Sequence, residues 1–267
     1  MEYTEQAPAR PFEGFEFLGI EIGGRSLEDL ITEANHSIEW GRPQFTMACA
    51  NPHSLVTAHA DPVFCEALRS STAVVADGSG VKLAGLLTGI KAGPRITGWD
   101  FFHGMMTRLN DRGGKAFFFG SRDVVLKRIL VNAWHDYPRV EIEVLSPPFG
   151  DWSAEQNEAM LTRIRESQPD VLWVGMTAPR QEKWTHANAA HLGVPVIGSI
   201  GAVFDYYAGT VQRAPGWICA IGLEWLYRLA GEPRRLWRRT VVSAPRFLWL
   251  VARERLATRW QREAAQQ

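Results

Sequence analysis

Apolar and polar positions follow two different periods along the chain. Short runs of consecutive apolar residues, rich in Val, Ile, Phe and Ala, are typical of buried strands. Longer segments between them carry apolar residues three and four positions apart, which is typical of helices with one buried face. The predicted strands cover residues 15–22, 44–50, 73–76, 115–119, 140–145, 171–174 and 196–200. The predicted helices start at residue 26 and then cover residues 62–70, 81–87, 99–112, 124–137, 154–167 and 179–191.

Two of these helices begin with a capping signal. Ser26 is followed three residues later by Asp29, and Ser153 is followed by Gln156. In such pairs the first side chain accepts a free backbone N–H and the second reaches back to the cap residue. Helices that alternate with short apolar strands predict an α/β fold, namely a Rossmann-like, largely parallel sheet with helices on both faces.

The pattern changes after Thr210, where no further strand is predicted and Arg and Trp become frequent. We therefore expect a flexible N-terminus at residues 1–11, an α/β domain at residues 12–209 and a helical basic appendage at residues 210–267. The 267 residues, 46% of them apolar, suffice for one such domain with an appendage.

Polar clusters follow five of the predicted strands. Parallel sheets bind ligands in a crevice at the carboxyl ends of their strands, so these clusters are expected to share one site. They comprise Asn51, the segment 77–80, the pair 120–121, the segment 177–182 and the segment 201–205.

Asp77 follows a strand directly and precedes Gly78, Ser79 and Gly80. Glycines permit close approach of a ligand to the backbone, and the next helix would aim free N–H groups at a phosphate. A carboxylate in this place suits a general base, but it equally suits a helix cap in a tight turn. Further on, Arg95 can bind a phosphate in bidentate fashion, or it can be a surface residue that pairs with Asp100.

The densest polar cluster covers residues 175–184, at the start of a predicted helix. Most of this cluster is explained by an ordinary helix start. Thr177 would cap the helix, Pro179 would lie in its first turn, and the helix dipole would favour Glu182. These features do not explain Gln181, whose amide can bind a sugar hydroxyl or a uracil edge. Asp205, after another strand, fits a turn residue and a ligand-binding residue equally well.

The net charge of zero, with 29 basic and 29 acidic residues, hides a strong asymmetry. From Thr210 onward the chain has 11 Arg, no Lys and 4 Glu, so this part carries +7 and the rest −7. No apolar run approaches the ~20 residues needed to cross a bilayer, and residues 1–11 lack a signal-peptide core. We expect a cytoplasmic protein whose contact with a membrane is peripheral.

Arg and Trp interleave in the appendage, which is typical of a helix lying in the headgroup region of an anionic membrane. Three other interpretations stay open: aromatic packing on the main domain, a solvated basic face, and nucleic-acid binding. The last is disfavoured because no nucleic-acid-binding motif accompanies the basic residues. The recurring aromatic residues are Trp217, Trp225, Trp237, Trp249 and Trp260.

The spacing of the Cys, His and Asp residues indicates neither a metal site nor a redox-active cysteine pair. The three cysteines, Cys49, Cys65 and Cys219, are far apart, and the seven histidines form no ligand pair. The chain also lacks the Asp-x-Asp pair with which many nucleotide-sugar transferases hold a divalent ion. We expect neither a metal nor a cofactor.

Taken together, these motifs resemble the WecG/TagA/CpsF family of bacterial glycosyltransferases over residues 15–239. Each motif alone is modest, but their order and spacing are highly specific. The matching segments are ANPH (50–53) with DP (61–62), VADGSGV (75–81), RITGWD (95–100), GMTAPRQEKW (175–184), GAVFD (201–205), AG (208–209), RAP (213–215), GLEWLYR (222–228) and EPRR (232–235).

The resemblance implies an inverting, metal-independent transfer from a UDP-sugar to a sugar on undecaprenyl diphosphate, during assembly of cell-surface polysaccharides or exopolysaccharide. It implies Asp77 as the general base, with Arg95 and Gln181 as further catalytic residues. It places the acceptor diphosphate and the inner membrane surface near the C-terminal arginines, and it leaves the oligomeric state open. The residues expected to bind substrate are Cys49, Asn51, Gly78, Gly80, Thr177, Asp205, Arg228, Arg235 and Arg238.

The sequence departs from the family pattern near the expected sugar site. Cys49 stands where members often carry Thr, and Ser79 replaces an aliphatic residue. Met176 and Thr177 replace a Leu-Gly pair, and Arg180 replaces Lys. The donor sugar can therefore be a hexose such as glucose as well as an N-acetylhexosamine such as N-acetylmannosamine.

Two other classes of function remain to be tested. A nicotinamide-dependent oxidoreductase or sugar epimerase would need a true glycine fingerprint and an acidic residue ~20 positions later, and neither is convincing here. A non-catalytic scaffold of a polysaccharide assembly complex is compatible with a site altered at Cys49.

Overall fold

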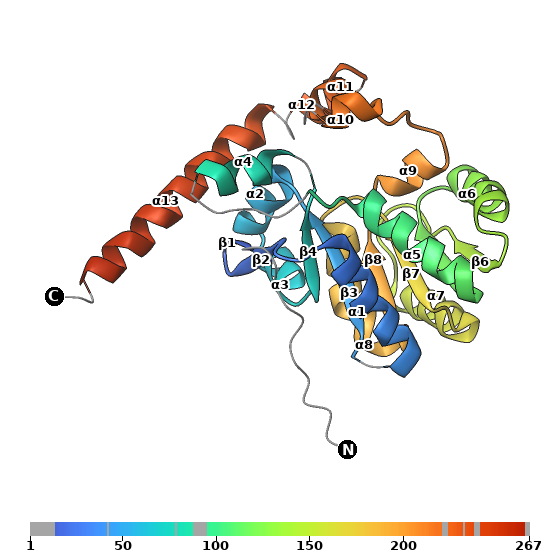
Figure 1. Ribbon diagram of the computed structural model, residues 1–267. Coiled ribbons are helices and arrows are strands. Elements are labelled where there is room, and N and C mark those ends of the chain that lie inside the picture. Colours follow the sequence, from blue (N-terminus) through green and yellow to red (C-terminus); the bar gives the residue numbers. More distant parts are fainter. Residues whose placement is uncertain are drawn as a thin grey trace.

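A six-stranded sheet in the order β4-β3-β8-β7-β5-β6 forms the centre of the molecule (Figure 1). All of its strand pairings are parallel, which confirms the Rossmann-like α/β prediction. The computed structural model describes residues 14–41, 43–77, 79–87, 95–220, 224–231, 233–237 and 241–264. The strands of the sheet are β3 (Phe45–Ala50), β4 (Ala73–Ala76), β5 (Gly114–Gly120), β6 (Val140–Leu145), β7 (Val171–Gly175) and β8 (Val196–Ser199).

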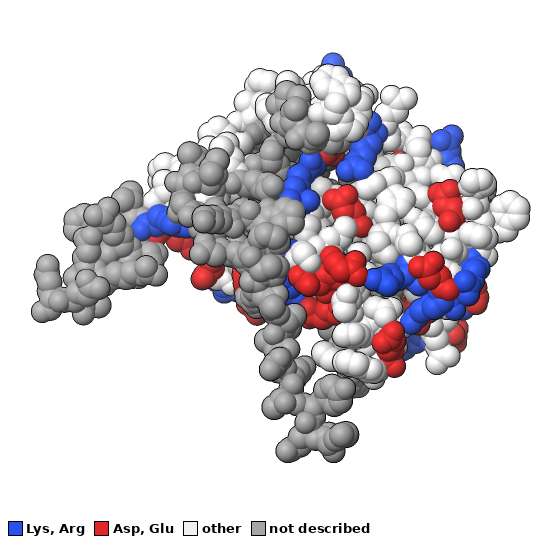
Figure 2. Space-filling model, viewed as in Figure 1, with Lys and Arg blue, Asp and Glu red and all other residues white. Residues whose placement is uncertain are grey.

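Helices cover both faces of this sheet. One face carries α1 (Leu27–Trp40), α5 (Gly98–Arg112), α6 (Asp123–Asp136) and α9 (Val203–Tyr207), which share one buried core with the sheet. The opposite face carries α2 (Pro52–Ala60), α3 (Pro62–Arg69), α7 (Ala154–Ser167) and α8 (Arg180–Leu192), with two further core clusters. A further helix, α4 (Ser79–Leu87), follows β4. Figure 2 shows described Lys and Arg side chains beside Asp and Glu side chains on this face of the molecule.

Residues 15–22 do not form the single strand expected from their apolar pattern. They form a small antiparallel hairpin of β1 (Phe15–Phe17) and β2 (Ile20–Ile22). Leu18 and Gly19 make the turn with positive φ angles of 55° and 70°. Gly19 adopts this conformation without strain because it has no Cβ, and the turn breaks the run into two strands.

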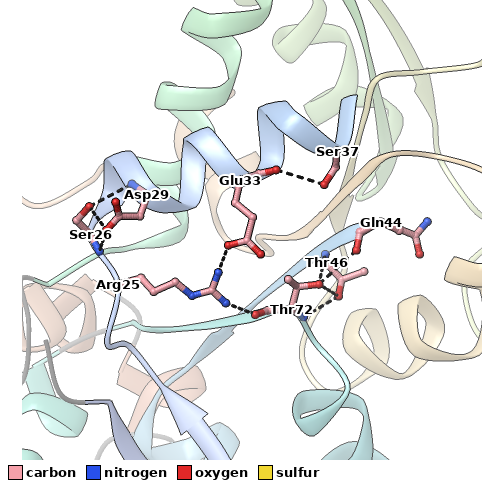
Figure 3. Close-up of polar contacts among 8 residues, drawn as sticks. All are labelled: Arg25, Ser26, Asp29, Glu33, Ser37, Gln44, Thr46 and Thr72. Carbon is pink, nitrogen blue, oxygen red and sulfur yellow. Dashed lines mark hydrogen bonds and ion pairs between the residues drawn. The ribbon is translucent and has the colours of Figure 1, made fainter. Parts of the chain in front are cut away.

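The start of α1 is fixed by the capping box expected from the sequence (Figure 3). Asp29 N–H donates to Ser26 Oγ at 3.1 Å, and Ser26 N–H donates to Asp29 Oδ2 at 3.1 Å. Arg25 binds both Glu33 of α1 and the carbonyl oxygen of Thr72. Arg25 thereby joins α1 to the segment that leads into the edge strand β4.

Helix α2 was not expected from periodicity, because its apolar residues do not follow one face. It begins at Pro52 because Asn51 caps it: Asn51 Oδ1 accepts the backbone N–H groups of His53 and Ser54, each at 3.0 Å. Proline in the first turn adds a preset φ angle and loses no helical hydrogen bond.

From Gly216 onward the described residues are helical, as expected for this part of the chain. The elements are α10 (Gly216–Ala220), α11 (Glu224–Gly231), α12 (Pro233–Trp237) and α13 (Ser243–Ala264). Helix α13 packs against α2, and Phe247 contacts Phe15 and Phe17 of the hairpin with ring centroids 6.3 and 5.4 Å apart. Among the residues described, no helix is both long enough and apolar enough to cross a membrane.

Candidate functional site

The parallel sheet brings the five polar clusters to one edge, as its topology requires. Asn51 follows β3, Asp77 follows β4 and Ser121 follows β5. Met176 and the rest of its cluster follow β7, and Gly201 lies just beyond β8. The clusters thus follow the carboxyl ends of parallel strands, and the order of strands places the ends of β4, β3, β8 and β7 next to one another. That all five clusters form one site stays a prediction.

Asp77 and Asn51 lie on neighbouring strand ends. Asp77 N–H donates to the carbonyl oxygen of Ala50 at 2.8 Å, which extends the pairing of β3 with β4 by one residue. The side-chain oxygen of Asn51 caps α2 by accepting two backbone N–H groups. The side-chain amide nitrogen is therefore the atom with which Asn51 can contact a ligand. Gly80 in α4 packs tightly on α2, because a methyl group there would lie 2.4 Å from Cγ of Pro52. Gly78 lies outside the described residues.

Cys49 lies in β3 between two acidic side chains. Burial, together with the negative charges of Asp77 and Glu182, raises the pKa of the Cys49 thiol, so it stays protonated at neutral pH. A methyl group on Gly98 would lie 3.0 Å from its sulfur, so the start of α5 also closes on this position. Cys49 therefore marks a point where β3, β4, α5 and α8 converge.

Gln181 and Glu182 lie in the first turn of α8, with 4% and 3% of their surface exposed. Gln181 Nε2 donates to Glu182 Oε1 at 2.9 Å. Burial raises the pKa of Glu182 to about 7. The sequence attributed Glu182 to the helix dipole and so missed it as a site residue. The only available signal was its place beside Gln181.

The loop before α8 differs from its expected capping pattern. The cap residue is Pro179 and makes no side-chain hydrogen bond, while Thr177 is exposed and only its carbonyl oxygen accepts, from Arg180 N–H at 3.0 Å. The Arg180 guanidinium lies 4.3 Å from the centre of the Trp152 ring and binds the carbonyl oxygen of Gly150. Arg180 thus connects this loop to the segment between β6 and α7.

Arg95 precedes α5 and forms an ion pair with Glu224 of α11 at 2.5 Å. Its alternative partner in the sequence, Asp100, is used differently: Asp100 Oδ2 accepts from Thr97 N–H at 2.8 Å and from its hydroxyl at 2.7 Å. The alternative in which Arg95 pairs with Asp100 is therefore not found, because Asp100 completes the capping box of α5. Arg95 instead links the sheet domain to the C-terminal helices.

An aromatic cluster beside α5 and α9 was not expected from the sequence. Arg213 lies 5.1 Å from the centre of the Trp99 ring, and Trp99 also contacts His103 and Tyr206. Burial lowers the pKa of His103. The only sequence signal was the spacing of Trp99 and His103 on one helical face. Asp205, in α9, accepts the Thr210 hydroxyl at 3.3 Å.

The remaining candidates belong to the C-terminal part of the chain. Arg228 and Arg235 belong to α11 and α12, but their side chains are outside the description, and Arg238 is outside it altogether. Within the described part of the chain, no three His, Cys, Asp or Glu residues are grouped so as to hold a metal ion.

Known proteins with similar sequences point to one class of enzyme. Residues 15–261 match the glycosyl transferase WecG/TagA/CpsF family. A relative in Bacillus subtilis strain 168 is 30% identical over 78% of this chain and 79% of its own length. A relative in Bacillus spizizenii is 29% identical over the same shares. Both are named N-acetylglucosaminyldiphosphoundecaprenol N-acetyl-beta-D-mannosaminyltransferase.

Proposed function

The chain is a glycosyltransferase that belongs to the WecG/TagA/CpsF family, and we propose that it transfers a hexose or N-acetylhexosamine from a UDP-sugar to a sugar on undecaprenyl diphosphate. Its two relatives are named as enzymes that transfer N-acetylmannosamine to N-acetylglucosaminyldiphosphoundecaprenol. These names support the proposed class of acceptor. Family membership also favours this reading over an oxidoreductase or a scaffold. Cell-surface or exopolysaccharide assembly is the process that such a product would feed.

We propose that the reaction inverts the anomeric centre with Asp77 as the base. The acceptor hydroxyl attacks the anomeric carbon and gives its proton to Asp77, while the bond to UDP breaks and UDP leaves. The observation that supports this role is the position of Asp77 at the end of β4, beside the end of β3 and close to Cys49. A positioned carboxylate of this kind contributes roughly 10²–10⁴-fold to the rate.

Arg95 and Gln181 have distinct roles in this proposal. The Arg95 guanidinium binds the diphosphate of the leaving group. The diphosphate competes with the carboxylate of Glu224 for this guanidinium. Gln181 orients the donor sugar from the first turn of α8, and Asn51, Thr177 and Asp205 complete the binding edge. Charge stabilisation by Arg95 and by helix N-termini takes the place of a metal ion.

The appendage at residues 210–267 is proposed to rest on the inner face of the cytoplasmic membrane, where the lipid-linked acceptor is found. Its +7 charge suits an anionic surface. Exposed tryptophans on four of its described helices suit the headgroup region: Trp217 of α10, Trp225 of α11, Trp237 of α12 and Trp249 of α13. Arg228, Arg235 and Arg238 would meet the acceptor diphosphate.

The proposal is tested by transfer assays with UDP-N-acetylmannosamine, UDP-N-acetylglucosamine and UDP-glucose and a short-chain lipid-diphosphate N-acetylglucosamine acceptor. We expect one donor to be used at an undiminished rate in EDTA, with inversion of configuration in the product. Loss of transfer in EDTA would overturn the metal-free mechanism. Failure of every UDP-sugar, together with stabilisation by another nucleotide sugar, would overturn the donor class.

A further inference from the structure

Gln181 has a buried neighbour that determines how its amide is oriented. The amide nitrogen donates to Glu182 Oε1 at 2.9 Å, so the amide oxygen faces away from the carboxyl group. The whole amide lies against Gly201, where a methyl group would be 3.2 Å from Oε1 and 3.4 Å from Nε2. Gly201 begins the loop after β8, at the same edge of the sheet as Asp77. The hydrogen bond therefore engages the amide nitrogen, and it leaves the amide oxygen beside Gly201 as the acceptor that a ligand could use.

Two polar atoms of this pair are buried without a protein partner. They are Gln181 Oε1 and Glu182 Oε2. A buried acceptor without a hydrogen bond costs free energy, so natural proteins rarely retain one without a functional reason. For Gln181 Oε1, which faces the loop after β8, a donor hydroxyl or N–H group of a ligand supplies the missing partner.

The carboxyl group of Glu182 has a polar environment of its own. Glu182 is one of the residues that line a cavity of about 230 Å³ between α3 and α8. Nearby, the hydroxyls of Thr185 and Ser199 are 3.2 Å apart. Thr46 and Thr72, which also line it, bind each other's backbone N–H groups at 3.0 and 3.1 Å (Figure 3). The lining of this cavity therefore includes hydroxyl groups as well as apolar side chains.

The charged groups around Glu182 do not neutralise it. Lys183, the next residue, forms an ion pair with Asp61 at the start of α3, and His186 hydrogen-bonds Ser70 at 2.7 Å. Cys49 on β3 is a neutral thiol. Burial raises the pKa of Glu182 to about 7, so much of the population is uncharged at neutral pH. In either protonation state Oε1 can accept from Gln181.

We propose that Glu182 is a positioning residue that fixes the Gln181 amide, so that its oxygen accepts a hydrogen bond from the donor substrate. This inference rests on the proposed function, in which Gln181 binds the donor. Glu182 itself touches no substrate. Its effect should therefore appear only while Gln181 is present.

A double-mutant cycle tests this dependence. Donor kcat and KM are measured for Gln181→Met, Glu182→Met and the double variant, with thermal unfolding followed in parallel. Met has a similar length and no hydrogen-bonding amide or carboxyl group. We expect each single change to lower kcat/KM by about 10- to 100-fold and the double change to add less than threefold.

Two further variants act as controls. Glu182→Gln keeps an oxygen that accepts from Gln181 Nε2, so we expect kcat/KM within about threefold of wild type. Thr185→Val alters the same cavity without contacting Gln181, so we expect normal kinetics even if stability falls. If Glu182→Met does not fold, a folded Glu182→Gln enzyme with a 100-fold loss would still overturn the proposal.

The outcomes separate this inference from the function on which it rests. A folded Glu182→Met enzyme with normal kcat/KM, or losses that multiply in the double variant, would overturn the positioning role alone. Normal transfer by Gln181→Met would overturn donor binding by Gln181 and, with it, the positioning role. A wild-type protein that transfers no sugar from any UDP donor would overturn the proposed function first.

Discussion

Single residues at the site show how burial selects protonation states. Burial and the negative charges of Asp77 and Glu182 raise the pKa of the Cys49 thiol, and burial raises the pKa of Glu182 to about 7. Cys49 in particular remains a thiol, which is a weak hydrogen-bond donor. The position therefore offers a ligand a polarisable S–H group and no negative charge.

Replacing Asp77 by Asn should remove the proposed base while conserving shape. We expect kcat to fall by roughly 10²–10⁴-fold with little change in donor KM, because an amide cannot accept the proton. Steady-state kinetics with a saturating acceptor measure the effect. Near-normal turnover of this variant would rule out Asp77 as the base.

The protonation of Glu182 should make stability depend on pH. Its pKa is raised from 4.5 to about 7, so the folded state holds a proton that the unfolded state releases, and stability is lost as pH rises from about 4.5 through about 7. At about 1.4 kcal/mol per pKa unit, the loss is on the order of 3 kcal/mol. Urea unfolding at pH 5 and pH 8 should show a smaller decline for Glu182→Gln than for wild type. Equal declines would contradict the pKa of Glu182.

At the scale of elements, α13 is anchored by its first turns and exposed on its other face. Phe247, Leu250 and Val251 are buried against the hairpin and α2, whereas Trp249 lies between them with 58% of its surface exposed. In Figure 1 this helix runs outward beyond the sheet domain. One helix thus has a packing face and a face open to another surface.

Replacing Phe247 by Ala should cost the protein about 3–5 kcal/mol of unfolding free energy, because a ring that is 1% exposed leaves a cavity against Phe15 and Phe17. Denaturant unfolding measures this loss. The matched control is Trp249→Ala in the same helix, which we expect to change stability by less than about 0.5 kcal/mol. Equal effects of both variants would contradict the assignment of the two faces.

At the scale of the whole molecule, one ion pair joins the site to the C-terminal helices. Arg95 holds Glu224 of α11, so the residue proposed to bind the UDP diphosphate also contacts the part of the chain proposed to meet the membrane. A diphosphate that replaces Glu224 would change this contact. If Arg95 binds the diphosphate as proposed, we expect substrate binding to change the contact between Arg95 and α11.

Membrane association is best measured by sedimentation with vesicles. We expect the protein to bind vesicles with 30% anionic lipid at low salt and to be released as the salt concentration rises, because its C-terminal charge is +7. Trp249→Ala should weaken binding. Trp134→Ala, an 80% exposed Trp on α6, should not. Equal binding to neutral vesicles would contradict the electrostatic part of the proposal.

Local rules determined much of this protein from sequence. The period of the apolar residues predicted most strands and helices of the α/β domain, because this period depends only on residues within one element. Ser26 and Ser153 each predicted the start of a helix, and the structure contains both capping boxes. The turn at Gly19 and the helix capped by Asn51 were not predicted. At these two places a turn residue or a cap residue, and not the apolar pattern, determines the local structure.

The tertiary structure alone decided which distant residues meet. Strand order places Cys49 near both Asp77 and Glu182, and no local pattern encodes that order. The sequence singled out Asp77 and Gln181 because their types and places at strand ends suited chemistry, and their catalytic roles stay predictions. Glu182 looked like an ordinary first-turn acid, and only packing of α8 on the sheet buried it. Burial and long-range pairing depend on the whole chain, whereas period and capping depend on a few adjacent residues.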